Sequence, residues 1–289
     1  MVSENSPLFG GFFLPRNGRL ILSRLFLVAV CWIVCQGHSH GVAQQAVSPD
    51  QDPRYYAVVW VQQAAEFRLL AEQTYRYALT QLVVGLKDPH WSADEVQLQR
   101  GEYQNLPAAV ILDLDETVLD NSFYNARNIV DGKNFTSQAW NQWCLEEKAE
   151  LIPGALDFIH AAEGLGVKIF YLTNREDVVK QATINNLNRL GLKADQQNVL
   201  TLNPEAGRGD DKLTRRSAVA ENYRVVMLIG DSMSDLCSGM DPADAATRNQ
   251  VAAEKSKFLG TRWIMLPNPV YGGWQRVLPA GKDALELKR

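Results

Sequence analysis

The sequence predicts an α/β protein with a doubly wound, Rossmann-like parallel sheet, a small and mainly helical cap, and a long N-terminal helix. Three observations support this fold class. Short apolar runs alternate with helical stretches, as they do in parallel sheets covered by helices. The first run shows no polar alternation, which is typical of a strand buried on both faces. Polar residues follow several runs directly, where parallel sheets bind ligands.

The composition is that of a soluble globular protein. The 289 residues are 46% hydrophobic and 21% charged, with a formal net charge of −4. These values are ordinary for one large domain, with or without an added segment. The charge balance provides no basic surface, so we expect no nucleic acid polymer as a partner.

Residues 1–43 have the features of a secretory signal peptide. Arginines precede an apolar run over residues 25–35, and small and polar residues follow it. About eleven apolar residues are too few to cross a bilayer but suit the core of a signal peptide. The best cleavage site follows Ala43. Cys31 and Cys35 both follow valine, where a lipoprotein signal needs a small residue, so we expect export while membrane attachment through an N-terminal anchor stays open.

Residues 44–106 are expected to form a linker and an N-terminal helical segment. A polar linker leads into a long amphipathic helix over residues 55–86, which Asp88 and Pro89 end. Apolar residues recur along this helix at steps of three and four and form one stripe. They are Trp60, Ala64, Phe67, Ala71, Tyr75, Ala78 and Leu82.

Residues 107–275 are expected to form the core, followed by a polar tail over residues 276–289. Strands are predicted over residues 108–112, 167–172, 199–202, 225–229 and 262–266, and helices over residues 153–165, 178–190, 213–222 and 242–258. The segment at about 121–152 fits no strand. Because it is inserted directly after the first strand, we interpret it as a cap over the carboxyl end of that strand.

Asp113 and Asp115 follow the first strand. Two carboxylates are costly to hold so close together unless a cation or a proton separates their charges. An acidic turn in which Thr117 caps a helix would give the same local pattern. The residues that end the later strands decide between these interpretations.

Further polar residues stand at the ends of those strands. The second strand ends in Thr173 and Asn174, the fourth leads to Asp231 and Asp235, and Lys212 opens a helix between them. Each residue alone fits a helix cap or a surface charge. Because the carboxyl ends of parallel strands share one edge, the set predicts a single site with four carboxylates, a hydroxyl and an ammonium group.

Phosphoryl transfer is the chemistry that this set suits. Asp113 would attack phosphorus and form an aspartyl-phosphate. Asp115 would protonate the leaving oxygen and then deprotonate the attacking water. Thr173 and Lys212 would hold the phosphate oxygens.

A hard cation held by oxygen ligands would offset the repulsion between the anionic nucleophile and the phosphate, and Mg²⁺ is the natural choice. Asp231 is the expected third ligand, and Asp235 would hold a metal-bound water.

These motifs resemble, in order, those of the haloacid dehalogenase superfamily: DLDET, TNR, a lysine, and GDxxxD. Other segments are similar to the class C acid phosphatases, the family of bacterial outer-membrane lipoprotein 5′-nucleotidases. They are DETVLDNSFY (115–124), the pair Trp140 and Trp143, IPGALDF (152–158), LPNPVYGGW (266–274), and Trp60 with AAEFR (64–68). The resemblance spans residues 56–274.

The resemblance implies a Mg²⁺-dependent phosphomonoesterase that accepts nucleoside 5′-monophosphates and nicotinamide mononucleotide. Its partner would be a small-molecule phosphomonoester, its location the periplasm or the outer membrane, and a homodimer stays open. It makes Asp113 the nucleophile, Asp115 the acid/base with its backbone carbonyl on the metal, and Asp231 the remaining protein ligand.

Aromatic residues of the cap and the C-terminal loop would stack on the base of a nucleotide. Trp143 and Tyr271 are the first candidates, and Tyr124 and Trp140 lie behind them. Asn174 is a further expected substrate contact. For each aromatic residue, ordinary core packing is the alternative.

One motif departs from the family pattern. Members usually carry GDNLxDF, whereas this chain has GDSMSDL, so Leu236 replaces an aromatic residue after Asp235. The metal ligands are kept, and the packing beneath them is expected to differ.

Other enzyme classes fit the sequence less well. A GDSL-type esterase would use Ser232 and a later histidine, but all four histidines (His38, His40, His90 and His160) precede Ser232. A phosphatase with a histidine nucleophile needs an RHG motif, which is absent. A dehalogenase would not be expected to keep Asp115.

A phospho-ligand binding or storage protein of the same fold is the alternative outside enzymes, and it would be expected to lack Asp113. Cys144 and Cys237 remain after cleavage and fit either a disulfide or two buried apolar positions.

Overall fold

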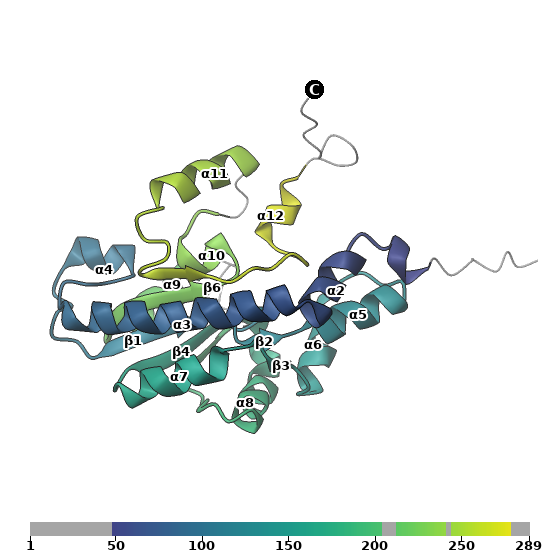
Figure 1. Ribbon diagram of the computed structural model, residues 1–289. Coiled ribbons are helices and arrows are strands. Elements are labelled where there is room, and N and C mark those ends of the chain that lie inside the picture. The colour runs from purple at the N-terminus through teal and green to yellow at the C-terminus, as the bar shows by residue number, and fades with distance from the viewer. Residues whose placement is uncertain (1–47, 204–211, 241–243, 279–289) are drawn as a thin grey trace, which may run out of the picture. The chain divides into compact units, whose positions relative to one another are not determined.

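The computed structural model describes residues 48–203, 212–240 and 244–278 (Figure 1). The predicted signal peptide and nearly all of the predicted polar tail lie outside these residues. No helix in the described part of the chain combines the length and the apolar character needed to cross a membrane.

A parallel sheet forms the centre of the described residues. Its five strands, in the order β5-β4-β1-β6-β7, are β1 (Ala108–Leu112), β4 (Lys168–Glu176), β5 (Val199–Leu202), β6 (Arg224–Gly230) and β7 (Trp263–Met265). The chain begins the sheet at its central strand and moves outward on both sides, so the predicted doubly wound fold is confirmed. β4 is longer than predicted and includes Thr173, Asn174 and Arg175.

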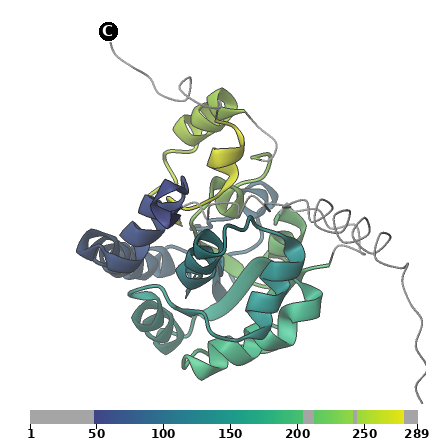
Figure 2. The ribbon, with the colours of Figure 1, turned by 90° about the vertical axis from the view of Figure 1, so that its right-hand side faces the viewer.

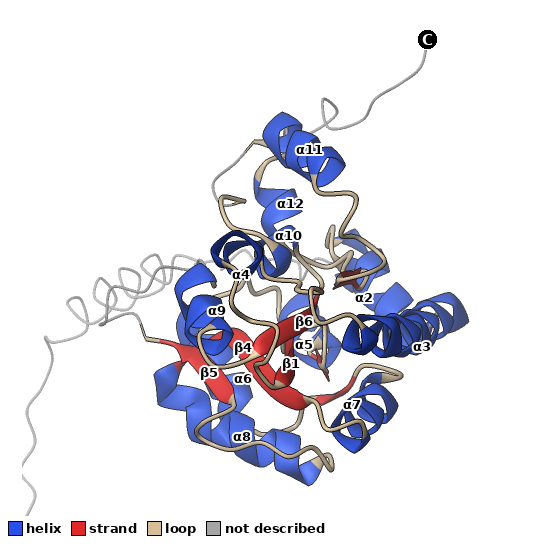
Figure 3. Ribbon diagram, turned by 90° about the vertical axis from the view of Figure 1, so that its left-hand side faces the viewer, coloured by secondary structure: helices blue, strands red, loops and turns tan. Residues whose placement is uncertain are grey.

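Helices cover both faces of the sheet (Figure 3). Val110 and Leu112 of β1 pack in one apolar cluster with residues of α3 (Ala65–Lys87) and α7 (Ala155–Gly164). Ala109 and Ile111 point the other way, into a second cluster that includes residues of α9 (Leu213–Ala220). This two-sided burial explains why the first strand is apolar without alternation.

Further elements surround the sheet. They are η1 (Pro49–Gln51), α4 (Glu95–Arg100), η2 (Asp177–Val179), α8 (Lys180–Arg189), α10 (Met233–Leu236), α11 (Ala245–Glu254) and α12 (Gly273–Arg276). The helices predicted from residues 153, 178, 213 and 242 correspond to α7, α8, α9 and α11. Helices α4, α10 and α12 were not predicted, because fewer than two turns provide too little periodicity to recognise.

The predicted helix over residues 55–86 is wrong in one respect, because it is two helices. α2 (Tyr55–Gln63) ends at Ala64, whose φ of −79° and ψ of 127° are extended, and α3 begins at the next residue. Apolar residues continue through the break at helical spacing, so the pattern could not reveal it. α2 contacts α5 (Ser122–Val130) of the inserted segment, and α3 runs beside β6 and β7.

The inserted segment contains two helices, α5 (Ser122–Val130) and α6 (Ser137–Leu145), which lie at the front of the molecule in Figure 2. It also contains β3 (Glu150–Leu151), which pairs antiparallel with β2 (Leu119–Asp120). The prediction that this segment fits no strand is therefore wrong. A two-residue strand shows no alternation, but the pairing joins the beginning and the end of the insertion.

Candidate active site

The carboxyl ends of β1, β4 and β6 meet at one edge of the sheet and position the candidate site. Asp113 follows β1 directly, and its backbone N–H donates to the carbonyl of Ile229 in β6 at 2.9 Å. Asp231 follows the end of β6, and Thr173 lies within β4. The nucleophile candidate is thus held by the sheet itself, with its side chain 8% exposed.

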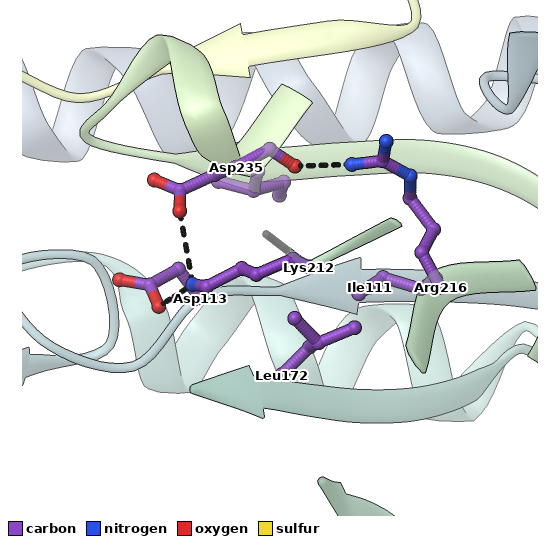
Figure 4. Close-up of a pocket in the computed structure, with 7 residues that line it drawn as sticks. Ile111, Asp113, Leu172, Lys212, Arg216 and Asp235 are labelled. Atoms are coloured by element: carbon purple, nitrogen blue, oxygen red, sulfur yellow. Dashed lines mark hydrogen bonds and ion pairs between the residues drawn. The ribbon is translucent and has the colours of Figure 1, made fainter. Parts of the chain in front are cut away.

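Three carboxylates form an acidic cluster. One oxygen from each of Asp113, Asp231 and Asp235 lies within 4.8 Å of the other two. The ammonium group of Lys212 contacts Asp113 Oδ1 and lies 2.9 Å from Asp235 Oδ1 (Figure 4). Lys212 comes from the start of α9 and is buried, so the interpretation of this residue as a surface charge is wrong.

Burial and mutual repulsion govern the charges in this cluster. Burial raises the pKa of Asp113 well above its usual range, Lys212 opposes the shift, and Asp235 and Asp231 add to it. Burial together with Asp235 raises the pKa of Asp231 to about 7. Burial alone would lower the pKa of Lys212, but the charges of Asp113 and Asp235 outweigh this effect and hold its pKa raised.

Lys212 brings one positive charge to the three carboxylates of this cluster. A hard divalent cation prefers oxygen ligands, and it would supply the missing positive charge at this cluster. The donor set of Asp113, Asp231 and Asp235 therefore fits such an ion.

Asp235 reaches the cluster because Gly230 has no side chain. A Cβ atom at Gly230 would lie 2.4 Å from the Cβ atom of Asp235, so a side chain there would force one of the two residues to move. The backbone N–H of Ser232 donates to Asp235 Oδ2 at 2.9 Å, and Arg216 donates to the Asp235 carbonyl at 3.1 Å. Leu236, which departs from the family pattern, is 1% exposed and packs in the second apolar cluster.

Asp115 has different neighbours from Asp113. Its Oδ1 atom accepts hydrogen bonds from Arg175 Nε at 2.9 Å, from Arg175 Nη2 at 2.8 Å and from Asn121 Nδ2 at 3.0 Å. Its Oδ2 atom accepts from Thr173 Oγ1 at 3.2 Å. Arg175 belongs to the TNR motif, but no role was predicted for Arg175 or for Asn121.

Thr173 and Asn174 are held from two sides. Thr173 is fully buried, and its hydroxyl accepts from the backbone N–H of Arg175 at 3.1 Å. Asn174 is exposed, and its Oδ1 atom accepts from the buried Arg215, which also donates to the Thr173 carbonyl. Because Arg215 is 3% exposed, it is not part of a charged surface around Lys212.

Thr117 does not begin a helix, so the interpretation as a cap is wrong. Its hydroxyl donates to Asp231 Oδ1 at 3.3 Å, and its carbonyl accepts from the hydroxyl of Tyr75 in α3 at 2.7 Å. The N-terminal helix thereby holds the loop that follows the two catalytic candidates.

The four aromatic candidates differ in burial. Trp143 and Tyr124 are 3% and 4% exposed, and the Trp143 indole N–H donates to Asn121 Oδ1 at 2.9 Å. Trp140 and Tyr271 are partly exposed. The ring of Trp140 packs edge-on against Tyr124 with 5.1 Å between centroids.

The C-terminal loop is tied to the acidic cluster through Asn268, which the sequence did not single out. Asn268 Nδ2 donates to Asp231 Oδ2 at 2.8 Å. Its Oδ1 atom accepts from the backbone N–H groups of Val270 at 2.9 Å and Tyr271 at 3.3 Å. One side chain therefore contacts a candidate metal ligand and fixes the loop that carries Tyr271.

The esterase alternative lacks a base in the described part of the chain. Ser232 Oγ lies 3.0 Å from Ser234 Oγ. His90 and His160, the two histidines in that part, lie near Gln104 and Gly191 respectively. Cys144 and Cys237 are free and buried, as expected for two apolar positions.

A doubly wound sheet with paired aspartates after its central strand, and a lysine and two more aspartates beside them, is the arrangement of the haloacid dehalogenase type. The chain belongs to the haloacid dehalogenase superfamily, subfamily IIIB, the acid phosphatases, whose family model matches residues 32–274.

Solved structures support the same assignment. The class C acid phosphatase from Bacillus anthracis is 32% identical, with a TM-score of 0.67 over 83% of this chain and 92% of that chain. The crystal structure of the class C acid phosphatase from Bacillus anthracis with tungstate bound gives a TM-score of 0.66 at the same identity and coverage. The resemblance to class C acid phosphatases is confirmed.

Sequence relatives include two plant proteins. Acid phosphatase 1 of Solanum lycopersicum is 27% identical over 164 residues, which cover 56% of this chain and 57% of that protein. Stem 31 kDa glycoprotein of Glycine max is 30% identical over 135 residues, which cover 44% and 51%. The chain thus spans about half the length of these curated relatives.

Proposed function

We propose that this chain hydrolyses phosphomonoesters with the help of Mg²⁺, through an aspartyl-phosphate on Asp113. The observation that supports this most is the position of Asp113 at the end of the central strand, in contact with Lys212 and within one acidic cluster with Asp231 and Asp235. Membership in the acid phosphatase family supports the reaction class.

The first half-reaction transfers the phosphoryl group to the protein. A carboxylate oxygen of Asp113 forms a bond to phosphorus while the bond from phosphorus to the leaving oxygen breaks. Asp115 gives its proton to that oxygen, so the leaving group departs as an alcohol. Lys212, whose ammonium group already contacts Asp113, holds the phosphate oxygens by charge.

The second half-reaction returns the protein to its starting state. Water attacks phosphorus, Asp115 takes one proton from the water, and the bond between phosphorus and Asp113 breaks. Inorganic phosphate is released, Asp113 is again a carboxylate, and Asp115 is again protonated.

Asp113, Asp231 and the backbone carbonyl of Asp115 are the groups that we propose hold the metal, and Asp235 lies beside them. When bound, Mg²⁺ would offset the repulsion between the phosphate and the carboxylates.

The proposed substrates include nucleoside 5′-monophosphates and nicotinamide mononucleotide. Of the four aromatic candidates, Trp140 and Tyr271 present partly exposed rings that a base could contact, whereas Trp143 and Tyr124 would support the cap from within. Asn174 is exposed and stays a proposed substrate contact. We also propose that the protein is exported to the periplasm, with cleavage after Ala43 or retention of an N-terminal anchor.

The decisive experiment measures phosphate release from a panel of esters, with Mg²⁺ and with excess chelator. The panel contains nucleoside monophosphates, nicotinamide mononucleotide and an aryl phosphate. Asp113→Asn should lose turnover by a factor on the order of 10³ or more, because no other group can form the covalent intermediate. Release should stop when the chelator is added and be fastest on nucleotides.

Asp157→Asn is the matched control, because Asp157 is an exposed aspartate on α7, away from the site. It should keep full activity. Activity retained by Asp113→Asn would rule out the aspartyl-phosphate, and release that is insensitive to the chelator would rule out the metal. A folded protein that binds phosphate esters but releases no phosphate would instead be a binding protein.

A further inference from the structure

The carboxyl group of Asp115 is held asymmetrically. Three hydrogen bonds reach its Oδ1 atom, two from Arg175 and one from Asn121, all between 2.8 and 3.0 Å. Oδ2 accepts one bond, from the Thr173 hydroxyl at 3.2 Å. The lone pairs of Oδ1 are therefore occupied, and Oδ2 is the oxygen with capacity left for a proton.

Arg175 is itself fixed from several directions. Its Nη2 atom also donates to Asn121 Oδ1 at 3.2 Å, and its Nη1 atom donates to Thr183 Oγ1 of α8 at 3.3 Å. The guanidinium carbon lies 5.6 Å from the ring centroid of Trp140 in the cap. The guanidinium group is planar and its N–H donors point in fixed directions, so it can orient a carboxyl group as well as supply a charge. A lysine ammonium group would supply the charge alone.

The two partners differ in their access to solvent. The Arg175 side chain is 0% exposed, whereas the Asp115 side chain is 16% exposed. A bound ester can therefore reach Asp115 but cannot reach Arg175. The direct route from Arg175 to the reacting groups is its pair of hydrogen bonds to Asp115.

We propose that Arg175 is the positioning residue of the acid/base. It fixes Asp115 through Oδ1 and so directs Oδ2, which carries the proton, toward the leaving oxygen. This inference rests on the proposed function, in which Asp115 protonates that oxygen as the bond to phosphorus breaks. The alternative is that Arg175 is a buried ion pair that only stabilises the fold.

Esters with different leaving groups separate these roles. A nitrophenolate departs readily without a proton, whereas an alkoxide needs one, so a misplaced acid slows alkyl phosphates more than nitrophenyl phosphate. The measured quantity is kcat/KM, which covers the steps up to release of the leaving group. The ratio of kcat/KM for 4-nitrophenyl phosphate to that for an alkyl phosphate then reports on proton donation.

Arg175→Gln and Arg175→Lys in the full chain are expected to raise this ratio by a factor on the order of 10 to 10², a part of the roughly 10²–10⁴ that general acid catalysis typically contributes. Arg224→Lys is the matched control. Arg224 is also buried, but it donates to backbone carbonyls at Gly85, Asp88 and Trp91, far from Asp115 in the chain. Arg224→Lys should lower the stability of the fold but leave the ratio of the two kcat/KM values as it is in the unchanged protein.

Asp115→Asn removes the acid completely, so it gives the upper limit for the rise in the ratio of kcat/KM values. If Asp115→Asn raises the ratio and the Arg175 variants do not, the role of Arg175 is overturned and the proposed function stands. If Asp115→Asn lowers kcat/KM for both esters by the same factor, Asp115 is not the acid, and the proposed role of Arg175 is overturned as well.

Circular dichroism shows which variants fold. Should Arg175→Gln unfold, Arg175→Lys keeps the charge, and Asn121→Ala removes a different donor from the same Oδ1 atom. Both should raise the ratio, Asn121→Ala by less. An unchanged ratio in every folded variant would make Arg175 a structural residue alone.

Discussion

Asp113 and Asp115 are two residues apart and carry the same chemical group, but the fold gives them different neighbours. Asp113 faces a lysine and two further aspartates, whereas Asp115 faces an arginine, an asparagine and a threonine. Lys212 and a bound cation would favour the ionised form that the Asp113 nucleophile needs, whereas Arg175 and Asn121 fix the orientation of Asp115.

Asn268→Ala is expected to weaken Mg²⁺ binding by a factor of about 10 to 100, the range seen when a residue that orients a metal ligand is removed. The reason is the hydrogen bond from Asn268 to Asp231 Oδ2 at 2.8 Å. Calorimetric titration of the protein with Mg²⁺ measures the affinity directly. Asn185→Ala, on the exposed face of α8, is the control and should bind as the unchanged protein does. Equal affinities in the two variants would contradict the prediction.

At the residue scale, the sequence predicts the site residues that directly follow strands. It does not predict the residues whose side chains hydrogen-bond to them from other positions. Asp113, Asp231 and Lys212 were predicted to meet, because the carboxyl ends of parallel strands share one edge, and they do. Arg175 and Asn268 were not singled out, because their contacts depend on side-chain direction and on loop paths that no periodicity records.

At the scale of elements, the site depends on a tight turn between β6 and α10. Gly230 ends the strand, and Asp235 folds back over it from α10, near enough that no Cβ atom fits between them. Replacement of this glycine must move the strand end or the carboxylate.

Gly230→Ala is therefore expected to lower the free energy of unfolding by about 1–3 kcal/mol, as overpacking does, and to reduce activity by displacing Asp235. Urea denaturation and phosphate release measure the two effects. Gly164→Ala is a matched control, because Gly164 is helical and nothing lies within 4 Å of an added Cβ atom. That variant should be neutral or more stable by up to about 1 kcal/mol. A fully stable and active Gly230→Ala protein would show that the turn adjusts freely.

The five predicted strands are present in the structure. Each is an apolar run that ends in polar residues, and this pattern can be recognised from the sequence without knowledge of tertiary contacts. The break between α2 and α3 was missed because one extended residue, Ala64, leaves the apolar spacing intact. The pair β2 and β3 was missed because two residues cannot show alternation.

At the scale of the whole described fold, the sheet separates two apolar clusters, and each contains one cysteine. Cys144 belongs to the cluster with α3 and α7, and Cys237 to the cluster with α9. Their separate burial explains why they do not pair, although the sequence left a disulfide open.

Both thiols are expected to resist labelling in the folded protein. Burial raises the pKa of Cys144 to about 12 and also raises the pKa of Cys237, so little of the reactive thiolate is present at pH 8. An exposed cysteine, with a pKa of about 8.5, would react readily there. Alkylation followed by peptide mass mapping should find both positions unmodified in the native protein and modified in guanidinium chloride. Native labelling of Cys144 at the unfolded rate would contradict the burial seen here.

The position of Asn268 also bears on how this family could diversify. Loops that select substrates can usually mutate freely, because the residues that perform the chemistry stand elsewhere. Here one side chain binds Asp231 and the backbone of Tyr271 together, so a change in the path of the C-terminal loop also disturbs the acidic cluster. If the cap and this loop contact the substrate as proposed, new specificities should arise more often through the cap, by substitutions around Trp140, than through this loop.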